Sequence, residues 1–179
     1  MRIVGGKYRG RVLTEFSGKD IRPTSDKARE SLFNILQFKI YGKTFLDLFC
    51  GSGAVGIEAI SRGASKVTFN DLDKRSIEIL RKNLEKLKIA EEFAIKNGDA
   101  LTLIKNTADK FDFIYIDPPY KLDLGQSILE CVSRALSDNG VAIFEDEKPF
   151  NGEVPGLKIV DARKYGRIHL TFFEKGEQI

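Results

Sequence analysis

Short apolar runs alternate with segments of helical periodicity from Thr44 onward. Five of these runs have helical stretches between them, which is typical of a parallel, doubly wound α/β sheet. Two further runs are joined by Tyr165-Gly166-Arg167 alone, and so short a connection requires an antiparallel hairpin. The strands are predicted over residues 44–49, 66–70, 93–96, 111–116, 141–145, 157–164 and 168–174. The pattern therefore predicts a seven-stranded, mostly parallel sheet with an antiparallel terminal hairpin.

The clearest helix is predicted over residues 73–88, where apolar residues recur at helical spacing and basic residues mostly occupy the other face. Another helix covers about 124–136 and is predicted to end at the stop signal Asn139-Gly140. An earlier helix begins after the N-cap residues Thr24-Ser25-Asp26 and ends near Phe38. The basic face of the helix over 73–88 is typical of a solvated surface.

The N-terminal segment precedes this alternation and differs from it. Residues 2–22 predict a short β-hairpin or an extended arm, with turns at Gly5-Gly6 and Arg9-Gly10. No linker separates two folded units in the remainder. We therefore divide the chain into an N-terminal arm, residues 1–24, and one α/β domain, residues 25–179.

Composition and charge narrow the class of protein. The chain has 179 residues, 42% of them hydrophobic, which suffices for one domain with a real core. Residues 1–30 hold eight basic and four acidic side chains, while the net charge of the whole chain is +3, so the remainder is nearly neutral. A basic end on a near-neutral body favours a polyanionic partner.

Two cysteines, Cys50 and Cys131, lie far apart in the sequence. This spacing argues against a zinc site and a disulfide framework, and it suits a reducing cytoplasm. The N-terminus lacks a signal-peptide pattern, and no apolar run approaches membrane-spanning length. We expect a cytoplasmic monomer that binds no metal and no membrane.

A glycine-rich turn follows the first predicted strand. Gly51, Gly53 and Gly56 match the pattern G-x-G-x-x-G between a strand and a helix. Such glycines permit a tight turn and a close approach of the backbone to a ligand at the helix N-terminus. Alone the pattern is a weak indication, since dinucleotide-binding enzymes share it.

Acidic residues at the ends of predicted strands sharpen this interpretation. Asp47 precedes the glycines, where a carboxylate repels a pyrophosphate but attracts the ammonium of an amino-acid moiety. Asp71 ends the second strand and can bind both ribose hydroxyls, while Asp73 caps the next helix. Asp99 either accepts from an adenine amino group or caps a helix. The predicted cofactor-binding residues are Asp47, Gly51, Ser52, Gly53, Asp71, Leu72, Asp99 and Ala100.

A second motif, Asp117-Pro118-Pro119-Tyr120, follows the fourth predicted strand. Consecutive prolines end a central strand and fix an extended turn. An amino group on a nucleobase offers two N–H donors, which the Asp117 carboxylate and the Pro118 carbonyl can accept. Tyr120 can stack on the base, which contributes roughly 1–3 kcal/mol. The four residues therefore predict methyl transfer to the amino nitrogen of an unstacked base.

Together these residues resemble class I S-adenosylmethionine-dependent methyltransferases with an (Asp/Asn)-Pro-Pro-(Tyr/Phe/Trp) motif. Residues 4–11 and 22–36 resemble, more narrowly, the RsmD family, which methylates N2 of one guanine in bacterial 16S rRNA of the small ribosomal subunit. The resemblance implies that the residues from Asp117 to Tyr120 are catalytic and that S-adenosylmethionine is the cofactor. The RNA contacts that it implies are Arg9, Arg11, Arg22 and Arg29. Residues 14–17 lack a proline that the family usually carries, so the local conformation of the arm stays open.

Other interpretations remain. An NAD-dependent oxidoreductase explains the glycines but leaves Asp47, the prolines and the basic arm without a role. A non-catalytic RNA-binding protein on the same fold is disfavoured, because both motifs are intact. Amino groups of adenine or cytosine in DNA or another RNA remain possible acceptors, because the tetrapeptide does not name the base. His169, on a terminal strand, and Cys50, beside the glycines, are predicted to be structural.

Overall fold

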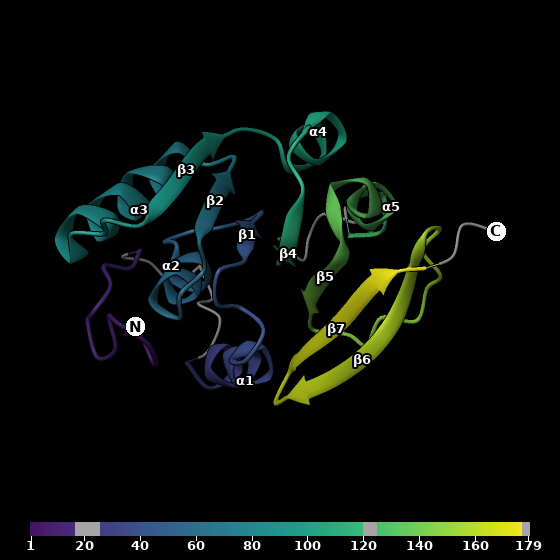
Figure 1. Cartoon of the computed structure of the whole chain (residues 1–179), viewed down its shortest axis with the longest axis horizontal. Coiled ribbons are helices and arrows are strands. Elements are labelled where there is room, and N and C mark those ends of the chain that lie inside the picture. The colour runs from purple at the N-terminus through teal and green to yellow at the C-terminus, as the bar shows by residue number, and fades with distance from the viewer. Residues whose placement is uncertain (17–25, 120–124, 177–179) are drawn as a thin grey trace.

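The computed structural model describes residues 1–16, 26–119 and 125–176. These residues contain one seven-stranded sheet with the strand order β3-β2-β1-β4-β5-β7-β6 (Figure 1). The strands are β1 (Thr44–Asp47), β2 (Lys66–Asp71), β3 (Glu92–Asn97), β4 (Phe111–Ile116), β5 (Leu136–Asp146), β6 (Leu157–Tyr165) and β7 (Ile168–Lys175). Strands β1 to β5 pair in parallel, and β7 runs antiparallel to both β5 and β6. The predicted fold class is confirmed.

Helices cover both faces of the sheet (Figure 1). They are α1 (Asp26–Leu36), α2 (Ala54–Ser61), α3 (Lys74–Leu87), α4 (Ala100–Asn106) and α5 (Gly125–Ala135). Side chains of β4 alternate between the faces: Phe113 and Tyr115 pack with α1, α2 and α3, whereas Ile114 and Ile116 pack with α4 and α5. Because both faces are covered, strands of this kind are apolar throughout rather than at every second residue.

The boundary between α5 and β5 differs from the prediction. β5 begins at Leu136, directly after α5, so Asn139-Gly140 lies inside a strand and does not end a helix. Leu136 is fully buried and pairs with Phe111, and the register then shifts before Phe113. A Cβ on Gly140 would lie 2.9 Å from the Phe111 carbonyl oxygen, so the glycine permits a close approach of two strands. Burial of Leu136 has overridden a local stop signal.

The described part of the N-terminal arm forms a minimal hairpin that is packed into the core. Backbone hydrogen bonds join residues 1–3 to residues 10–13, around a single antiparallel bridge. Ile3, Tyr8 and Leu13 are buried in the same cluster as the apolar faces of α1, α2 and α3. This part of the arm is therefore integrated into the core of the α/β domain.

The arm turns against the end of α2. Gly6 has a φ of 74°, and a Cβ there would lie 1.8 Å from the carbonyl oxygen of Ser61, the last residue of α2. Ser61 accepts the backbone N–H of Lys7 on its carbonyl oxygen and that of Tyr8 on Oγ. Lys7 and Tyr8 also donate through their side chains to Glu91, at 2.6 and 2.7 Å. α2 begins after the loop at the carboxyl end of β1 and returns toward the amino edge of the sheet. Its last residue, Ser61, and the turn of the arm therefore lie near the amino edge.

A buried carboxylate in α2 holds the arm in place. Glu58 is 0% exposed and accepts the backbone N–H groups of Val4 and Gly5, at 2.9 and 2.8 Å. The same carboxylate accepts from Arg62 Nε at 3.0 Å and lies 3.7 Å from Arg29 Nε. Burial of a charge costs free energy unless the charge is paired and hydrogen-bonded. Here the two arginines and the two N–H groups compensate the buried carboxylate.

Arg29 therefore has a different role from the expected one. Its side chain is 0% exposed, and one terminal nitrogen donates to the carbonyl oxygen of Arg2 at 2.5 Å. A side chain enclosed in this way cannot reach RNA, so the expectation of an RNA contact at Arg29 is wrong. Its cation instead joins α1 to the arm and to Glu58.

Replacement of Glu58 by alanine is expected to lower the free energy of unfolding by about 3–5 kcal/mol, because Arg29 is left as a buried charge without this carboxylate. Urea denaturation followed by circular dichroism measures the change. Glu85→Ala, at an exposed position of α3, is the matched control and should cost less than about 0.5 kcal/mol. Equal stability of the two variants would contradict the assignment of Glu58 as the residue that holds the arm.

Candidate active site

Five parallel strands end at one edge of the sheet, and the predicted site residues lie at or directly after the ends of β1 to β4. Backbone hydrogen bonds tie the ends together, from Leu48 to Tyr115, from Cys50 to Asn70 and from Gly98 to Asp71. The Asn70 side chain, 1% exposed, donates to the carbonyl oxygens of Leu48 and Gly98 at 3.1 and 3.2 Å. A platform built on paired strand ends is more rigid than isolated loops would be.

The three glycines have separate roles. Gly51, with a φ of 52°, has no described heavy atom within 4 Å of the position that a Cβ would take. Gly53, with a φ of 84°, is the N-cap of α2, and a Cβ there would lie 2.3 Å from Leu80. A Cβ on Gly56 would lie 2.3 Å from the Phe69 ring. Gly53 and Gly56 therefore serve packing, while Gly51 leaves open space above the loop.

Asp71 holds the glycine-rich loop from the neighbouring strand. Its carboxylate oxygens accept the backbone N–H of Gly51 and of Asp73, each at 2.8 Å. Burial raises the pKa of this partly exposed carboxyl, against the effect of the two N–H donors. Leu72, beside it, is 70% exposed, so the end of β2 presents a carboxylate and an apolar surface together. As predicted, Asp73 is the N-cap of α3, since its side chain accepts from Arg75 N–H.

Asp47 lies underneath the loop. It is 1% exposed, and its carboxylate accepts the backbone N–H of Gly56 at 2.8 Å. Burial raises the pKa of Asp47 to about 7, and the nearby Asp71 adds to the rise. The same burial, with both acids contributing, raises the pKa of the Cys50 thiol, which therefore stays protonated and unreactive at neutral pH.

Asp99 fulfils one of the two roles that the sequence left open. Its Oδ1 accepts from the backbone N–H and the hydroxyl of Thr102, at 2.8 and 2.7 Å, so it is the N-cap of α4. These hydrogen bonds lower the pKa of the Asp99 carboxyl. The capping role is confirmed, and contact with an adenine stays a prediction. Ala100, the next residue, is 5% exposed.

The segment from Asp117 to Pro119 directly follows β4, as predicted. Asp117 is partly exposed, Pro118 is buried and Pro119 is exposed. Tyr120 lies outside the described residues. Because Ile116 pairs with Phe144, Asp117 follows at the row of Glu145 in the adjacent strand.

The sequence interpretation missed two polar residues of the site. Glu145 is 2% exposed and accepts a short hydrogen bond from the Tyr115 hydroxyl. An acid that ends an apolar strand, as Asp47 and Asp71 do, was the available signal for it. Asn83, in α3, is 0% exposed, and an asparagine inside a predicted amphipathic helix offered no comparable signal.

Asn83 connects the arm to the glycine-rich loop. Its Nδ2 donates to the carbonyl oxygens of Ser52 and Thr14, at 2.9 and 3.0 Å, and its Oδ1 accepts the Thr14 N–H at 2.7 Å. Buried amides with all these partners present are strongly oriented. One side chain therefore fixes the loop after β1 relative to the N-terminal arm.

The predicted RNA contacts are not all placed alike. Arg9 and Arg11 are exposed, whereas Arg22 lies outside the described residues. Arg9 follows the turn that packs against Ser61, at the end of α2. The eight residues of α2 separate this turn from Gly53, at the start of the helix, by roughly 12 Å. Arg9 therefore does not line the edge that carries Asp117.

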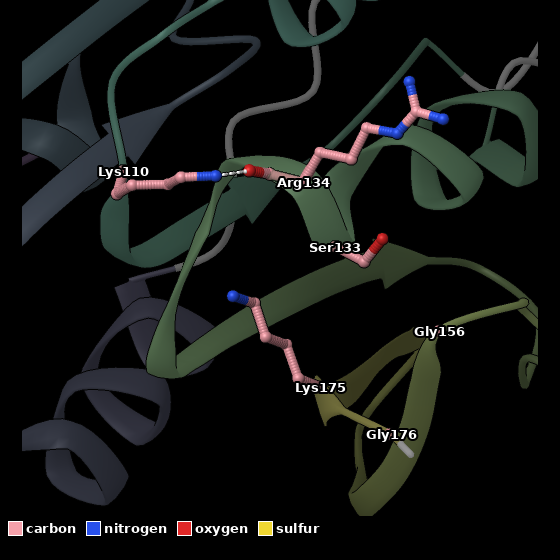
Figure 2. Close-up of a pocket in the computed structure, with 6 residues that line it drawn as sticks. All are labelled: Lys110, Ser133, Arg134, Gly156, Lys175 and Gly176. Atoms are coloured by element: carbon pink, nitrogen blue, oxygen red, sulfur yellow. Dashed lines mark hydrogen bonds between the residues drawn. The ribbon is translucent and has the colours of Figure 1, made fainter. Parts of the chain in front are cut away.

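A separate hollow of about 560 Å³ lies at the opposite, amino edge of the sheet (Figure 2). Figure 2 shows the Lys110 ammonium directed at the Arg134 carbonyl oxygen, to which it is hydrogen-bonded, while the Arg134 guanidinium extends away from Lys110. A lysine on the last carbonyls of α5 is a stabilising arrangement at a helix C-terminus. This hollow is not connected with the residues predicted to be catalytic.

No group of histidine, cysteine, aspartate and glutamate side chains in the described ranges is arranged to hold a metal ion. No helix in this part of the chain is long and apolar enough to cross a membrane.

Comparison with known proteins decides the family. A family model described as "Conserved hypothetical protein 95" matches residues 1–174. The ribosomal RNA small subunit methyltransferase D of Haemophilus influenzae is 39% identical over 153 residues, which cover 83% of this chain and 79% of that protein. The chain belongs to the RsmD family. The putative rRNA methyltransferase YlbH of Bacillus subtilis is a further relative, 34% identical over 98% of this chain and 99% of its own length.

A solved structure supports the same assignment. The putative methyltransferase yhhF from Escherichia coli superposes with a TM-score of 0.88, at 31% identity, over 99% of both chains. The class I methyltransferase fold predicted from the sequence is therefore confirmed.

The raised pKa of Asp47 predicts a pH-dependent stability. The carboxyl ionises at about pH 7 in the folded chain and at its ordinary value of 3.8 in the unfolded chain, so its burial costs stability increasingly between these values. Asp47→Asn should therefore raise the free energy of unfolding at pH 8, relative to its effect at pH 4, by roughly 2–4 kcal/mol.

Urea denaturation at the two pH values measures this difference. Asp138→Asn, at a carboxylate that is 99% exposed, is the control and should show no such pH-dependent gain. An effect of Asp47→Asn that is the same at pH 4 and pH 8 would show that the buried carboxyl is not the source.

Proposed function

We propose that this protein transfers a methyl group from S-adenosylmethionine to the N2 amino group of a guanine in bacterial 16S rRNA. The observation that carries the proposal is the position of Asp117-Pro118-Pro119 beside the glycine-rich loop, at one edge of the sheet. Relatives of the RsmD family that are named ribosomal RNA small subunit methyltransferase D support the choice of acceptor.

The residues around the loop fit the proposed cofactor. The open space above Gly51 allows a ligand to approach the backbone closely, and Asp71 can accept from ribose hydroxyls on lone pairs not used by the N–H donors. The exposed side chain of Leu72 offers an apolar surface to an adenine ring. Asp47 and Asp71 together favour a cationic ligand, because their pKa values are raised and a nearby positive charge would relieve their repulsion. The cofactor supplies an activated methyl group on a sulfonium.

The Asp117 segment would orient the amino group. The Asp117 carboxylate and the Pro118 carbonyl accept its two N–H bonds, so that the nitrogen lone pair points at the methyl carbon. On accepting the methyl group the nitrogen would become positively charged, and it would then lose one proton to solvent water or to the Asp117 carboxylate, which restores a neutral amine. Orientation of this kind contributes on the order of 7–11 kcal/mol. In the proposed role Asp117 is a hydrogen-bond acceptor first.

The arm would contribute to binding of the RNA outside the target nucleotide. Arg9 and Arg11 are exposed and can neutralise phosphates there. Arg22 is proposed to act with them on the basis of its place in the RsmD family motif. In this proposal residues 1–24 are the arm that contacts RNA, and residues 25–179 are the catalytic domain.

Asp117→Ala is expected to lower kcat about 100- to 1000-fold, which is the usual effect of removing one oriented hydrogen-bonding group. Binding of S-adenosylhomocysteine, measured by calorimetry, should change less than threefold. Asp117→Asn keeps one acceptor oxygen and should retain more activity than the alanine variant. If the asparagine variant folds and is as inactive as the alanine variant, then the charge is required and the proposed role is wrong.

A second experiment tests the acceptor. The protein is incubated with methyl-labelled S-adenosylmethionine and separate pools of small-subunit RNA, assembled small subunits and DNA, followed by nucleoside analysis. The expected product is N2-methylguanosine in RNA. Labelled N6-methyladenine or a methylated cytosine in DNA, without labelled RNA, would favour the DNA alternative instead. Tight binding of NADH without binding of S-adenosylhomocysteine would favour an oxidoreductase.

A further inference from the structure

The tip of the β6–β7 hairpin lies at the same edge of the sheet as Asp117. The register leads directly across the strands, since Ile116 pairs with Phe144, Phe144 with Thr171, and Thr171 with Ala162. Three strand spacings place Ala162 about 14 Å from Ile116. The hairpin then continues to Tyr165, so its tip extends roughly 10 Å past the end of β4 along the strand direction.

This tip is basic and exposed. Arg163, Lys164 and Arg167 are all exposed, and Tyr165 lies among them. The one acid of β6, Asp161, accepts from Arg163 Nε at 2.9 Å and offsets one of the three charges. An edge strand is often protected by such charges, and Lys158 at the other end of β6 is one of these, but protection alone does not require three cations at the tip. A basic tip with an aromatic residue suits a nucleic acid strand.

A small hollow of about 180 Å³ lies beside the tip, between β6 and β7 and the segment after β5. Its lining combines apolar residues, among them Pro149, Phe150, Ile159 and Ala162, with polar residues that include Lys164 and His169. Phe150 is held edge-on against Phe144 and Phe173, at centroid distances of 5.9 and 5.3 Å. The aromatic wall of the hollow is therefore preformed.

Hydrogen bonds hold the segment after β5 beside the hollow. His169 Nδ1 lies 3.0 Å from the carbonyl oxygen of Glu147, which can only accept, so this nitrogen donates. The carboxylate of Asp146 accepts the backbone N–H groups of Glu147 and Lys148 and is thus directed to its own loop. Lys164, which pairs with His169 across the hairpin, supplies a positive charge beside the hollow.

We propose that the hairpin tip and this hollow bind the RNA strand next to the target base. Phosphates lie against Arg163, Lys164 and Arg167, and the hollow takes the base of one unpaired neighbouring nucleotide. The inference rests on the proposed function for its choice of RNA. It differs from the role of the arm, because the turn of the arm lies near the opposite edge of the sheet, whereas the hairpin tip extends past the edge that holds the target amino group.

The charge contribution is tested by a triple variant, R163A/K164A/R167A. Its KM for 16S rRNA or small subunits should rise at least tenfold, and the slope of log KM against log salt should fall by about 2. kcat at saturating RNA and the affinity for S-adenosylhomocysteine should stay within twofold of wild type. The matched control removes three exposed lysines elsewhere, K86A/K105A/K158A, and includes one at the other end of β6. Equal effects of the two triple variants would overturn the proposal.

The hollow is tested without a change of charge. Ala162→Trp fills the space beside Phe150 and should raise the KM for RNA several-fold while the salt dependence keeps its wild-type slope. An unchanged KM would overturn the nucleotide subsite. The control substitution, Ala108→Trp, is at an exposed residue on the loop before β4 and should leave KM unchanged.

Direct RNA binding, measured by fluorescence anisotropy with a labelled 16S rRNA fragment, separates this inference from the proposed function. A wild-type protein that methylates RNA, with no loss in the hairpin variants, keeps the function and overturns the inference. A wild-type protein that binds RNA through the hairpin without methylating it keeps the inference and overturns the proposed function. A protein that neither binds nor methylates RNA overturns both.

Discussion

The loop after β1 is held by hydrogen bonds from the elements around it, and the candidate site depends on that constraint. Two of its residues, Gly51 and Gly53, have left-handed backbone conformations, which by themselves favour no single loop shape. Asp71 accepts from Gly51 N–H, and Asn83 donates to the Ser52 carbonyl oxygen. Asp47 accepts from Gly56 N–H in the first turn of α2. These partners lie on three different elements, so the loop is defined only once β1, β2 and α3 have come together.

Asp47 shows that the same arrangement has a cost. A buried carboxyl whose pKa is raised to about 7 is partly ionised at neutral pH, in surroundings that favour its neutral form. A hydrophobic or amide side chain would pack there with less cost in the absence of a ligand. Two neighbouring acids under an open loop are explained more readily by a positively charged ligand than by the needs of the fold.

The sequence predicted most of the fold because strand–helix alternation is a long-range pattern with little ambiguity. Every strand was placed within a few residues of its observed bounds, apart from the start of β5. That error has a physical cause, since Asn139-Gly140 is a local turn signal and the burial of Leu136 is a tertiary effect. Local signals therefore succeeded where no competing contact exists and failed where one does.

The site residues also divide into those that a local pattern predicts and those whose role depends on tertiary contacts. Asp47, Asp71 and Asp117 could be predicted because strand ends in a parallel sheet meet at one edge whatever the side chains do. Arg29 could not, because its burial depends on Glu58, which is distant in sequence and lies in a helix that predicts only core packing. Asn83 and Glu145 were missed for the same reason, because their hydrogen-bond partners belong to other segments.

A basic segment in a sequence predicts a charge but not the edge of the sheet at which it lies. The basic N-terminus was the evident candidate for RNA contact, yet the turn before Arg9 packs against the end of α2, away from Asp117. The sequence offered no reason to predict RNA contact at the β6–β7 hairpin, because three cations are common in an edge strand. Only the pairing of Thr171 with both Phe144 and Ala162 places them beside the end of β4. Electrostatic attraction is screened beyond a Debye length of about 8 Å, so each basic segment acts only on phosphates close to it. Its placement on the fold, rather than its total charge, therefore decides which part of a bound nucleic acid it can contact.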